Sequence, residues 1–229
     1  MQYDAKQSWN QLYAEGSEMA WPAEGVIRIF KGRFPDLTMP KPQVGARVLD
    51  VGCGDGRHLP LFQSIGLEAA GAEISDDIVA HLKARMKRVG ASADLRTGHA
   101  GSLPWQDATF DYLLSWNSCY YMSLTGRNFP RHVEEMARVL KPGGWIVCSI
   151  PKKGCFIFNG SEADTVEGYR IVRADYFGLR NGELMRCMDG RSDVEQAFSE
   201  HFKAFCHADI DMDWFGLAYR WHVFCAERR

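Results

Sequence analysis

The amino-acid sequence predicts an α/β fold: a doubly wound, mostly parallel sheet with helices on its faces, an antiparallel C-terminal edge strand and an N-terminal helical accessory. Two observations predict it. Between residues 46 and 151, short β-branched apolar segments alternate with amphipathic segments of helical periodicity, and the first apolar segment runs directly into a glycine-rich stretch. Such alternation is typical of βαβ units, in which a crossover helix joins two parallel strands.

The first predicted elements are a strand, a tight loop and a helix, followed by a second strand and helix. ARVLDV from Ala46 is the strand, VGCGDGRH the loop and RHLPLFQSIG the helix, and GLEAAGAEIS is a second strand that ends at Glu73. We expect Ser75 to cap the next helix, DDIVAHLKARMKRVG, because a serine hydroxyl accepts a hydrogen bond from the first turn.

The alternation continues to Pro151. ADLRT and FDYLLSW predict the third and fourth strands, and HVEEMARVLK predicts a helix whose apolar residues recur at i, i+3, i+4 and i+7 from Val133. The sequence KPGG is expected to end this helix and to turn the chain into a fifth strand, WIVCSIP.

Both ends of the chain depart from the alternating pattern. After Pro151, YRIV and ELMRCM predict strands, DVEQAFSEHF an amphipathic helix, and KAFCHADI and YRWHVFCAE two final strands. Before the first strand, amphipathic segments lie around SWNQLYAE and EGVIRIFKGRF, and we expect them to pack over the core.

Composition excludes several classes of protein. The 229 residues include 27 Lys and Arg against 29 Asp and Glu, a net charge of −2, which argues against a dedicated nucleic-acid binder. Seven cysteines form no CxxC pair, and the N-terminus lacks the pattern of a secretion signal. With no apolar run long enough to span a bilayer, these features predict a cytoplasmic protein with reduced thiols and no membrane partner.

The loop after the first strand has glycines at 52, 54 and 56, the spacing G-x-G-x-G. The dinucleotide fingerprint G-x-G-x-x-G requires a glycine where this chain has Arg57, which counts against a nicotinamide-dependent dehydrogenase. Because glycine has no Cβ, the loop backbone can approach a ligand closely. Glu73 ends the second strand 21 residues after Gly52, where its carboxylate can accept hydrogen bonds from both hydroxyls of a ribose.

Four segments in this order resemble the class I S-adenosylmethionine-dependent methyltransferases, and among them the type 11 group. They are VLDVGCGDG (48–56), Glu73, GHAGSLPWQDATFDYLLS (98–115) and VLKPGGWIVCSIP (139–151). The resemblance implies a Rossmann-like fold and S-adenosylmethionine as cofactor. It implies that Asp50, Gly52 and Gly54 line its methionine part, with Cys53 and Gly56 in the same loop, that Glu73 holds the ribose, and that Ile74 packs on the adenine.

The third segment departs from the family pattern. The family commonly has an Asp after its glycine, bonded to the adenine amino group, whereas this chain has His99, so that Ala100 is expected to contribute only its backbone. Trp116 and Asn117, just past the fourth strand, occupy the place from which the family approaches the sulfonium. The resemblance thus predicts one domain over 1–229: an N-terminal helical lid or accessory (1–40), a cofactor-binding core (46–151), and a substrate-shaping insertion with the C-terminal strands (152–229).

Methyl transfer by direct displacement needs an acceptor held in line, so positioning supplies much of the catalysis and a dedicated catalytic residue is not required. His99, Asn117 and Tyr121 are the candidates for such a role. His58 is a second candidate for a general base, if the acceptor has an acidic proton. The histidines have no zinc-binding spacing, so no metal is expected, and His81 and His132 are expected on helix surfaces.

The candidates for residues that shape the acceptor site lie in three segments of the chain. Each has an ordinary alternative as a packing, loop or surface residue. The candidates are Trp9, Tyr13, Trp21, Tyr120, Tyr121, Tyr169, Tyr176, Arg180 and Arg186.

The leading functional hypothesis is transfer of a methyl group to O or N of a small-molecule acceptor, with an aromatic metabolite as one option, by a monomer or homodimer. One alternative is an RNA or protein methyltransferase, for which the cations Arg28, Lys31, Arg33 and Lys41 would form a local basic patch. Another is a cofactor-binding module that has lost catalysis.

Overall fold

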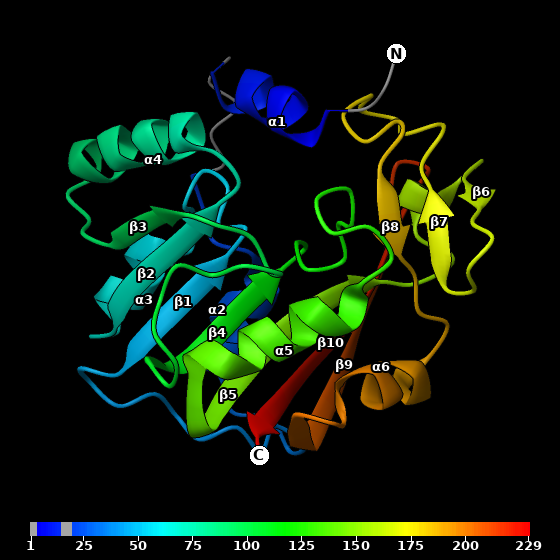
Figure 1. Cartoon of the computed structure of the whole chain (residues 1–229). Coiled ribbons are helices and arrows are strands. Elements are labelled where there is room, and N and C mark those ends of the chain that lie inside the picture. Colours follow the sequence, from blue (N-terminus) through cyan, green and yellow to red (C-terminus); the bar gives the residue numbers. More distant parts are fainter. Residues whose placement is uncertain (1–3, 15–19) are drawn as a thin grey trace.

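The computed structural model describes residues 4–14 and 20–229, in which helices cover both faces of a seven-stranded sheet (Figure 1). The strand order is β3-β2-β1-β4-β5-β10-β9. The strands are β1 (Arg47–Val51), β2 (Glu68–Glu73), β3 (Asp94–Thr97), β4 (Phe110–Trp116), β5 (Leu140–Pro151), β9 (Phe202–Trp214) and β10 (Leu217–Arg228). Strands β1 to β5 are parallel, and β10 runs antiparallel to both β5 and β9. The predicted doubly wound fold is confirmed. The predicted antiparallel C-terminal strand is β10, which lies between β5 and β9 rather than at the edge of the sheet.

Six helices accompany this sheet in the described part of the chain. They are α1 (Ala5–Ala14), α2 (Glu24–Lys31), α3 (Leu59–Ser64), α4 (Asp76–Arg88), α5 (Phe129–Val139) and α6 (Arg191–Phe198). Alternate residues of β1 belong to two different apolar clusters: Leu49 and Val51 pack with α5 and α6, whereas Val48 packs with α2, α3 and α4. The core therefore has two halves, one on each face of the sheet.

Local sequence signals explain the helix and strand ends near the site. The Ser75 hydroxyl accepts a hydrogen bond from the backbone N–H of Ile78, so the predicted cap of α4 is confirmed. Strand β1 pairs with β2 on one side and with β4 on the other. The order of the strands reverses at this point, where open α/β sheets bind ligands at the carboxyl ends of their strands.

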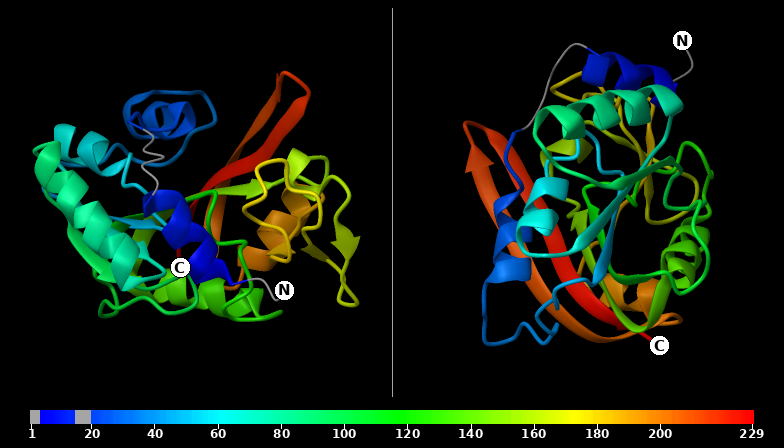
Figure 2. Two further views of the ribbon diagram at one scale, coloured as in Figure 1. Left: turned by 90° about the horizontal axis from the view of Figure 1, so that it is seen from above. Right: turned by 90° about the vertical axis from the view of Figure 1, so that its left-hand side faces the viewer.

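The structure differs from the sequence prediction around the fifth strand. Strand β5 begins at Leu140, directly after α5, whereas we expected KPGG to separate the two elements. Leu140 pairs with Phe110 and Trp145 with Tyr112, so Lys141–Gly144 form a bulge within the strand. The final two strands are also longer than predicted, because their outer parts pair as a hairpin that extends beyond the sheet (Figure 2).

A small second sheet was not predicted as a unit. Strands β6 (Glu162–Ala163), β7 (Tyr169–Ile171) and β8 (Leu184–Arg186) form it, and the 3-10 helix η1 (Phe156–Phe158) precedes it. The backbone N–H of Met122 donates to the carbonyl of Leu184, which ties the loop after β4 to β8. The insertion thus lies beside the carboxyl ends of β4 and β5.

Helix α1 lies across the same end of the sheet, between α4 and the strands of the small sheet (Figures 1 and 2). Part of the predicted N-terminal accessory, residues 1–3 and 15–19, falls outside the described residues. Within the described residues, no helix is long and apolar enough to cross a membrane.

Candidate functional site

The glycine loop after β1 brings bare backbone to the carboxyl end of the sheet. Gly52 and Gly54 have φ angles of 67° and 58°, in the left-handed region that favours glycine. A Cβ on Gly52 would lie 2.5 Å from Cβ of Ser118, and a Cβ on Gly54 would lie 2.5 Å from the hydroxyl of Tyr13. Both positions therefore need glycine for conformation and for space.

Two other residues of this loop, Cys53 and Gly56, lie against the protein interior. The Cys53 side chain is buried against Gly71 of β2, although the residue also borders the second cavity described below. A Cβ on Gly56 would meet Leu82 of α4, and Gly56 lines neither cavity of the site. Gly56 therefore serves the packing of helices below the loop rather than contact with a ligand.

Asp50 is also turned away from both cavities. Its carboxylate is 1% exposed and lies 2.9 Å from Nδ1 of His58, the residue that precedes α3. The expected direct contact of Asp50 with a methionine group is therefore replaced by a contact between two buried side chains.

Glu73, at the end of β2, faces the glycine loop. Its Oε1 accepts a hydrogen bond of 2.6 Å from the backbone N–H of Gly54, and Oε2 accepts one of 2.9 Å from its own neighbour Ile74. Burial raises the pKa of this carboxyl group to about 7, against the effect of these two hydrogen bonds. Each oxygen keeps a lone pair with which it can accept a further hydrogen bond.

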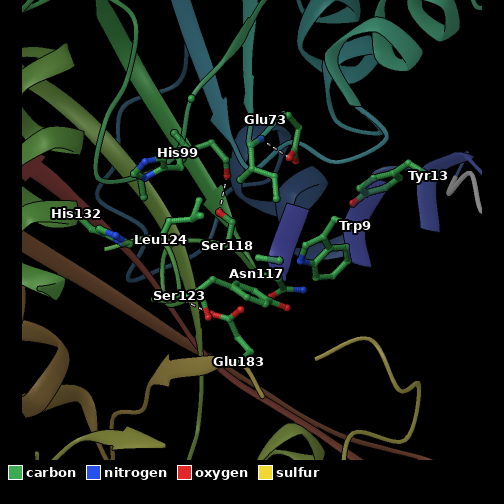
Figure 3. A pocket seen from close by; sticks show the side chains of 17 residues that line it. Trp9, Tyr13, Glu73, His99, Asn117, Ser118, Ser123, Leu124, His132 and Glu183 are labelled. Atoms are coloured by element: carbon green, nitrogen blue, oxygen red, sulfur yellow. Dashed lines mark hydrogen bonds between the residues drawn. The ribbon is translucent and has the colours of Figure 1, made fainter. Parts of the chain in front are cut away.

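A cavity of about 750 Å³, the first cavity, opens beside Glu73 (Figure 3). Trp9 and Tyr13 of α1 lie on one side of it, and His99 and His132 lie on the other (Figure 3). The expected cofactor contacts that line it are Gly52, Glu73, Ile74, His99, Ala100 and Asn117. The fold thus brings together residues at or just after the ends of four strands, β1 to β4.

The two histidines of this cavity differ in their contacts. His99 Nδ1 accepts a hydrogen bond from the backbone N–H of Gly101, and burial lowers the pKa of His99. His132 was expected on a helix surface, and this expectation was wrong: the residue is 2% exposed. Its ring nitrogens lie 2.8 Å from the Cys119 carbonyl and 2.7 Å from the Thr125 hydroxyl, and burial lowers its pKa to about 4. His81 is exposed, as expected.

The loop after β4 separates this cavity from a second one. Asn117 has a φ angle of 59°, and its backbone N–H and side-chain carbonyl both bond the Ser149 hydroxyl. Its amide also donates to the hydroxyl of Tyr219. The ring of Trp116 packs against Gly25 of α2, and Trp116 borders the second cavity rather than the first. These bonds hold Asn117 at the junction of the two cavities.

The second cavity has an empty volume of about 1350 Å³ and largely aromatic walls. Tyr120 stacks on Tyr121 at 5.0 Å between ring centroids, and Trp9 meets Tyr121 edge-on at 5.8 Å. Arg180 donates a hydrogen bond of 2.8 Å to the Tyr121 hydroxyl, pairs with Asp175 and lies over the ring of Trp9. Phe156 of η1 and Trp221 of β10 complete the walls.

Some of the residues that the sequence predicted for the acceptor site line neither of the two cavities. Trp21 and Tyr176 are 82% and 74% exposed and line neither cavity. Tyr169 is buried, and its hydroxyl bonds the backbone of residues 127 and 129. Arg186 lies over the ring of Tyr169 and donates to backbone carbonyls. Trp21 and Tyr176 are therefore surface residues, whereas Tyr169 and Arg186 make contacts within the protein.

Sequence reasoning missed several residues of both cavities. His132 and Glu183 line the first cavity, and Phe156, Trp221 and Tyr219 line the second. Glu183 is fully buried and accepts hydrogen bonds from the backbone N–H groups of Met122 and Ser123. A glutamate that begins a short predicted strand gives no signal of burial, because this burial arises from the contact of that strand with a loop 60 residues earlier.

Comparison with known proteins agrees with this geometry. Residues 48–144 match a family model described as a methyltransferase domain. A probable S-adenosylmethionine-dependent methyltransferase of Mycolicibacterium smegmatis is 31% identical over 112 residues, 49% of this chain and 40% of that protein. A demethylmenaquinone methyltransferase of Bacillus cytotoxicus is 33% identical over 111 residues, 45% of this chain and 44% of that protein. This chain therefore spans less than half of the length of these curated relatives.

Among solved structures, the fold is similar to that of the 1,6-didemethyltoxoflavin-N1-methyltransferase of Burkholderia thailandensis. That structure contains 1,6-didemethyltoxoflavin and S-adenosylhomocysteine; the TM-score is 0.64 at 16% identity, over 97% of this chain and 86% of that one. Residues 48–144 of this chain thus match a methyltransferase domain. The cofactor named for the relative of Mycolicibacterium smegmatis is S-adenosylmethionine.

The residues present fit this cofactor. Gly52 and Gly54 present bare backbone at the walls of the two cavities, and Glu73 keeps acceptor capacity beside the first one. Among the residues that the structure describes, no group of three or more His, Cys, Asp and Glu side chains is placed to hold a metal.

Proposed function

We propose that this chain transfers the methyl group of S-adenosylmethionine to an oxygen or nitrogen atom of a small, flat acceptor. The observation that carries the proposal is the arrangement of the two cavities, which share Trp9, Tyr13, Gly52, Asn117 and Tyr121 on their walls. A cofactor in the first cavity and an acceptor in the second would meet at these residues. Positioning of this kind supplies much of the rate of a displacement reaction.

Individual roles in cofactor binding follow from the chemistry of the first cavity. Glu73 accepts hydrogen bonds from the ribose hydroxyls, Ile74 and Ala100 contact the adenine, and the backbone at Gly52 and Gly54 borders the methionine part. When bound, the cofactor supplies an electrophilic methyl group on a sulfonium. Aromatic faces favour such a cation by roughly 0.5–2 kcal/mol each. Trp9 and Tyr121 are the nearest candidates for this role.

Helix α1 is proposed to act as a lid within a single domain over 1–229. Asn10 bonds Ser75 at 2.5 Å and Asp77 at 3.2 Å, which ties the helix to the start of α4. On its other side, Trp9 contacts Tyr121 and Arg180. A lid with these contacts would exclude water from the junction of the two cavities.

A small acceptor is favoured over RNA or protein. The second cavity has aromatic walls suited to a flat ring, and two cations of the expected basic patch are engaged. Arg28 pairs with Glu24 within α2, and Lys41 bonds the backbone carbonyl of Gly32. The relative described as a demethylmenaquinone methyltransferase also supports a small acceptor. The seven buried free cysteines support a reducing compartment, and we propose the cytoplasm.

The proposal is tested by incubating the protein with S-adenosylmethionine that carries a labelled methyl group and a panel of hydroxylated and amino aromatic compounds. We expect label in a small organic product, and none with the variant Glu73→Ala. Label found only in added RNA or protein, or transfer that is unchanged in Glu73→Ala, would contradict the proposal.

A further inference from the structure

The hairpin of β9 and β10 has one apolar face. In the segment DIDMDW (209–214), carboxylates alternate with apolar side chains, and successive side chains of a strand point to opposite faces. Residues that pair across two antiparallel strands share a face. The pairs on the apolar face are Ile210 with Trp221, Met212 with Tyr219, and Trp214 with Leu217. The three carboxylates of the segment therefore lie on the other face.

This apolar face runs from the protein core out to solvent. Trp221 is 2% exposed, whereas Trp214, near the turn of the hairpin, is 56% exposed. The outer part of the hairpin extends beyond the sheet (Figure 2). Trp214, Leu217, Tyr219 and Trp221 all line the second cavity. One wall of that cavity is therefore apolar from its buried part to its exposed part.

A row of aromatic contacts joins the same wall to the junction of the two cavities. Asn117, at the junction, donates a hydrogen bond to the hydroxyl of Tyr219. The ring of Tyr219 stacks on Phe156 at 6.5 Å between centroids, and Phe156 meets Phe177 edge-on at 6.0 Å. Phe177 lines the second cavity and is 54% exposed. The row of Tyr219, Phe156 and Phe177 thus leads from the junction to solvent.

The charged side chains of the second cavity come from other segments. Asp55 and Arg57 belong to the loop after β1, and Arg180 pairs with Asp175. The row of Tyr219, Phe156 and Phe177 and the apolar face of the hairpin have no charged side chain of their own. Hydrocarbon that lies along them is removed from water without the burial of a charge.

Phe177 and Trp214 form the rim of this cavity, since both line it and both are about half exposed. Large apolar side chains that are exposed together are typical of binding surfaces. A flat ring held beside Asn117 and Tyr121 would not by itself account for an apolar rim.

We propose that the acceptor is a flat ring that carries a long hydrocarbon chain. The ring lies beside Asn117, and the chain follows Tyr219 and Phe156 to the rim formed by Phe177 and Trp214. This inference rests on the proposed function, for which it specifies the class of acceptor.

The test uses two probes with the same head group, para-ethylphenol and para-hexylphenol, which differ by four methylene groups. Calorimetry with saturating S-adenosylhomocysteine measures their affinities. Complete burial of one methylene group raises affinity by about fourfold, so we expect para-hexylphenol to bind the wild type at least about tenfold more tightly than para-ethylphenol. This ratio of affinities is the chain-length gain.

Two variants at the rim should reduce the chain-length gain. In Trp214→Thr and in Phe177→Ser, we expect it to fall by about threefold or more, because less apolar surface then covers the chain. The affinity for para-ethylphenol should stay within about twofold of that of the wild type, because its short chain ends before the rim. Both side chains are about half exposed, so neither change leaves a cavity in the core.

The matched control is Phe215→Asn, at the turn of the same hairpin. Phe215 is fully exposed, does not line the second cavity, and has a φ angle of 53°, which asparagine tolerates. This variant removes an exposed aromatic ring beside Trp214 and should keep the whole chain-length gain. An equal loss of the gain in Phe215→Asn and in Trp214→Thr would mean that the chain adheres to exposed apolar surface, and would overturn the proposal.

The remaining outcomes separate this inference from the proposed function. Methyl transfer to para-ethylphenol without a chain-length gain in the wild type would overturn the inference alone. A chain-length gain without methyl transfer to either probe would support the chain site and count against the proposed function. Binding to phosphatidylcholine vesicles that Trp214→Thr and Phe215→Asn weaken equally, with no chain-length gain, would assign the rim to a lipid surface and overturn the proposal.

Discussion

The carboxylate of Glu73 accepts a hydrogen bond of 2.6 Å from the backbone N–H of Gly54. This bond joins the end of β2 to the glycine loop after β1, so the acid proposed to hold the ribose and the backbone proposed to border the methionine part form one unit. The Glu73 carboxyl group is buried in this position, and burial raises its pKa to about 7. Its charge state therefore changes within the physiological range of pH.

The first prediction concerns the pH dependence of cofactor binding. The ionised carboxylate is the form that accepts hydrogen bonds from a ribose on both oxygens. With a pKa of about 7, the ionised fraction rises roughly tenfold between pH 6 and pH 8. We expect the affinity for S-adenosylhomocysteine, measured by calorimetry, to rise by a similar factor. Glu73→Gln should bind weakly with little dependence on pH, and the same slope in both proteins would contradict this account.

The second prediction concerns the stability of the fold, where Glu73 and His132 act in opposite directions. The raised pKa of Glu73 lets the folded state keep a proton between about pH 4.5 and 7, so the free energy of unfolding falls as pH rises there. The pKa of His132 is lowered from 6.5 to about 4, so its contribution to that free energy rises with pH across this interval. Each contribution reaches at most about 3 kcal/mol.

The two slopes largely cancel in the wild type between pH 4.5 and 6.5. Urea unfolding of Glu73→Gln over this range should therefore reveal stability that increases with pH, and His132→Gln should reveal stability that decreases with pH. Two variants with the same pH profile as the wild type would show that the two pKa shifts are absent.

A third prediction separates two roles of Gly52: its left-handed backbone conformation and the close approach of a ligand to its backbone. Gly52 and Gly90 have nearly the same φ angle, 67° and 68°, but only Gly52 has a neighbour within 4 Å of an added Cβ. Gly90→Ala should lose about 1–2 kcal/mol of stability from backbone strain, and Gly52→Ala should lose more, because its Cβ would also clash with Ser118. Only Gly52→Ala should also lose affinity for S-adenosylhomocysteine, by more than tenfold. Equal affinities in the two variants would argue against close approach of the cofactor to Gly52.

A fourth prediction tests the proposed lid. Asn10→Ala removes the bonds from α1 to Ser75 and Asp77. Because one hydrogen bond contributes roughly 1 kcal/mol, amide hydrogen exchange in residues 5–14 should become several-fold faster. S-adenosylhomocysteine should slow this exchange in the wild type. Gln7→Ala, at an exposed position of the same helix, is the control. Exchange that is insensitive to both Asn10→Ala and the ligand would contradict the lid.

Much of the proposed cofactor site was predictable because its geometry follows from strand order. Parallel strands place their carboxyl ends at one edge, so a glycine loop after β1 and an acid at the end of β2 must meet there. The spacing of Gly52, Gly54 and Glu73 therefore carries the information without knowledge of packing.

The parts that were not predictable depend on contacts between segments far apart in the chain. An amphipathic pattern shows that α1 packs against a surface but not which one, so the sequence left Trp9, Tyr13 and Trp21 equivalent. In the structure, Tyr13 covers Gly54, whereas Trp21 is exposed. His132 lies on the inner face of α5 because the loop after β4 supplies two hydrogen-bond partners for its ring.

The central claim is that Glu73 and the glycine loop hold S-adenosylmethionine, and calorimetric titration with S-adenosylhomocysteine tests it most directly. The wild type should bind one equivalent, Glu73→Ala should bind at least tenfold more weakly, and Glu68→Ala, at the exposed start of the same strand, should bind like the wild type. No binding to the wild type, or equal affinities for the wild type and Glu73→Ala, would contradict the claim.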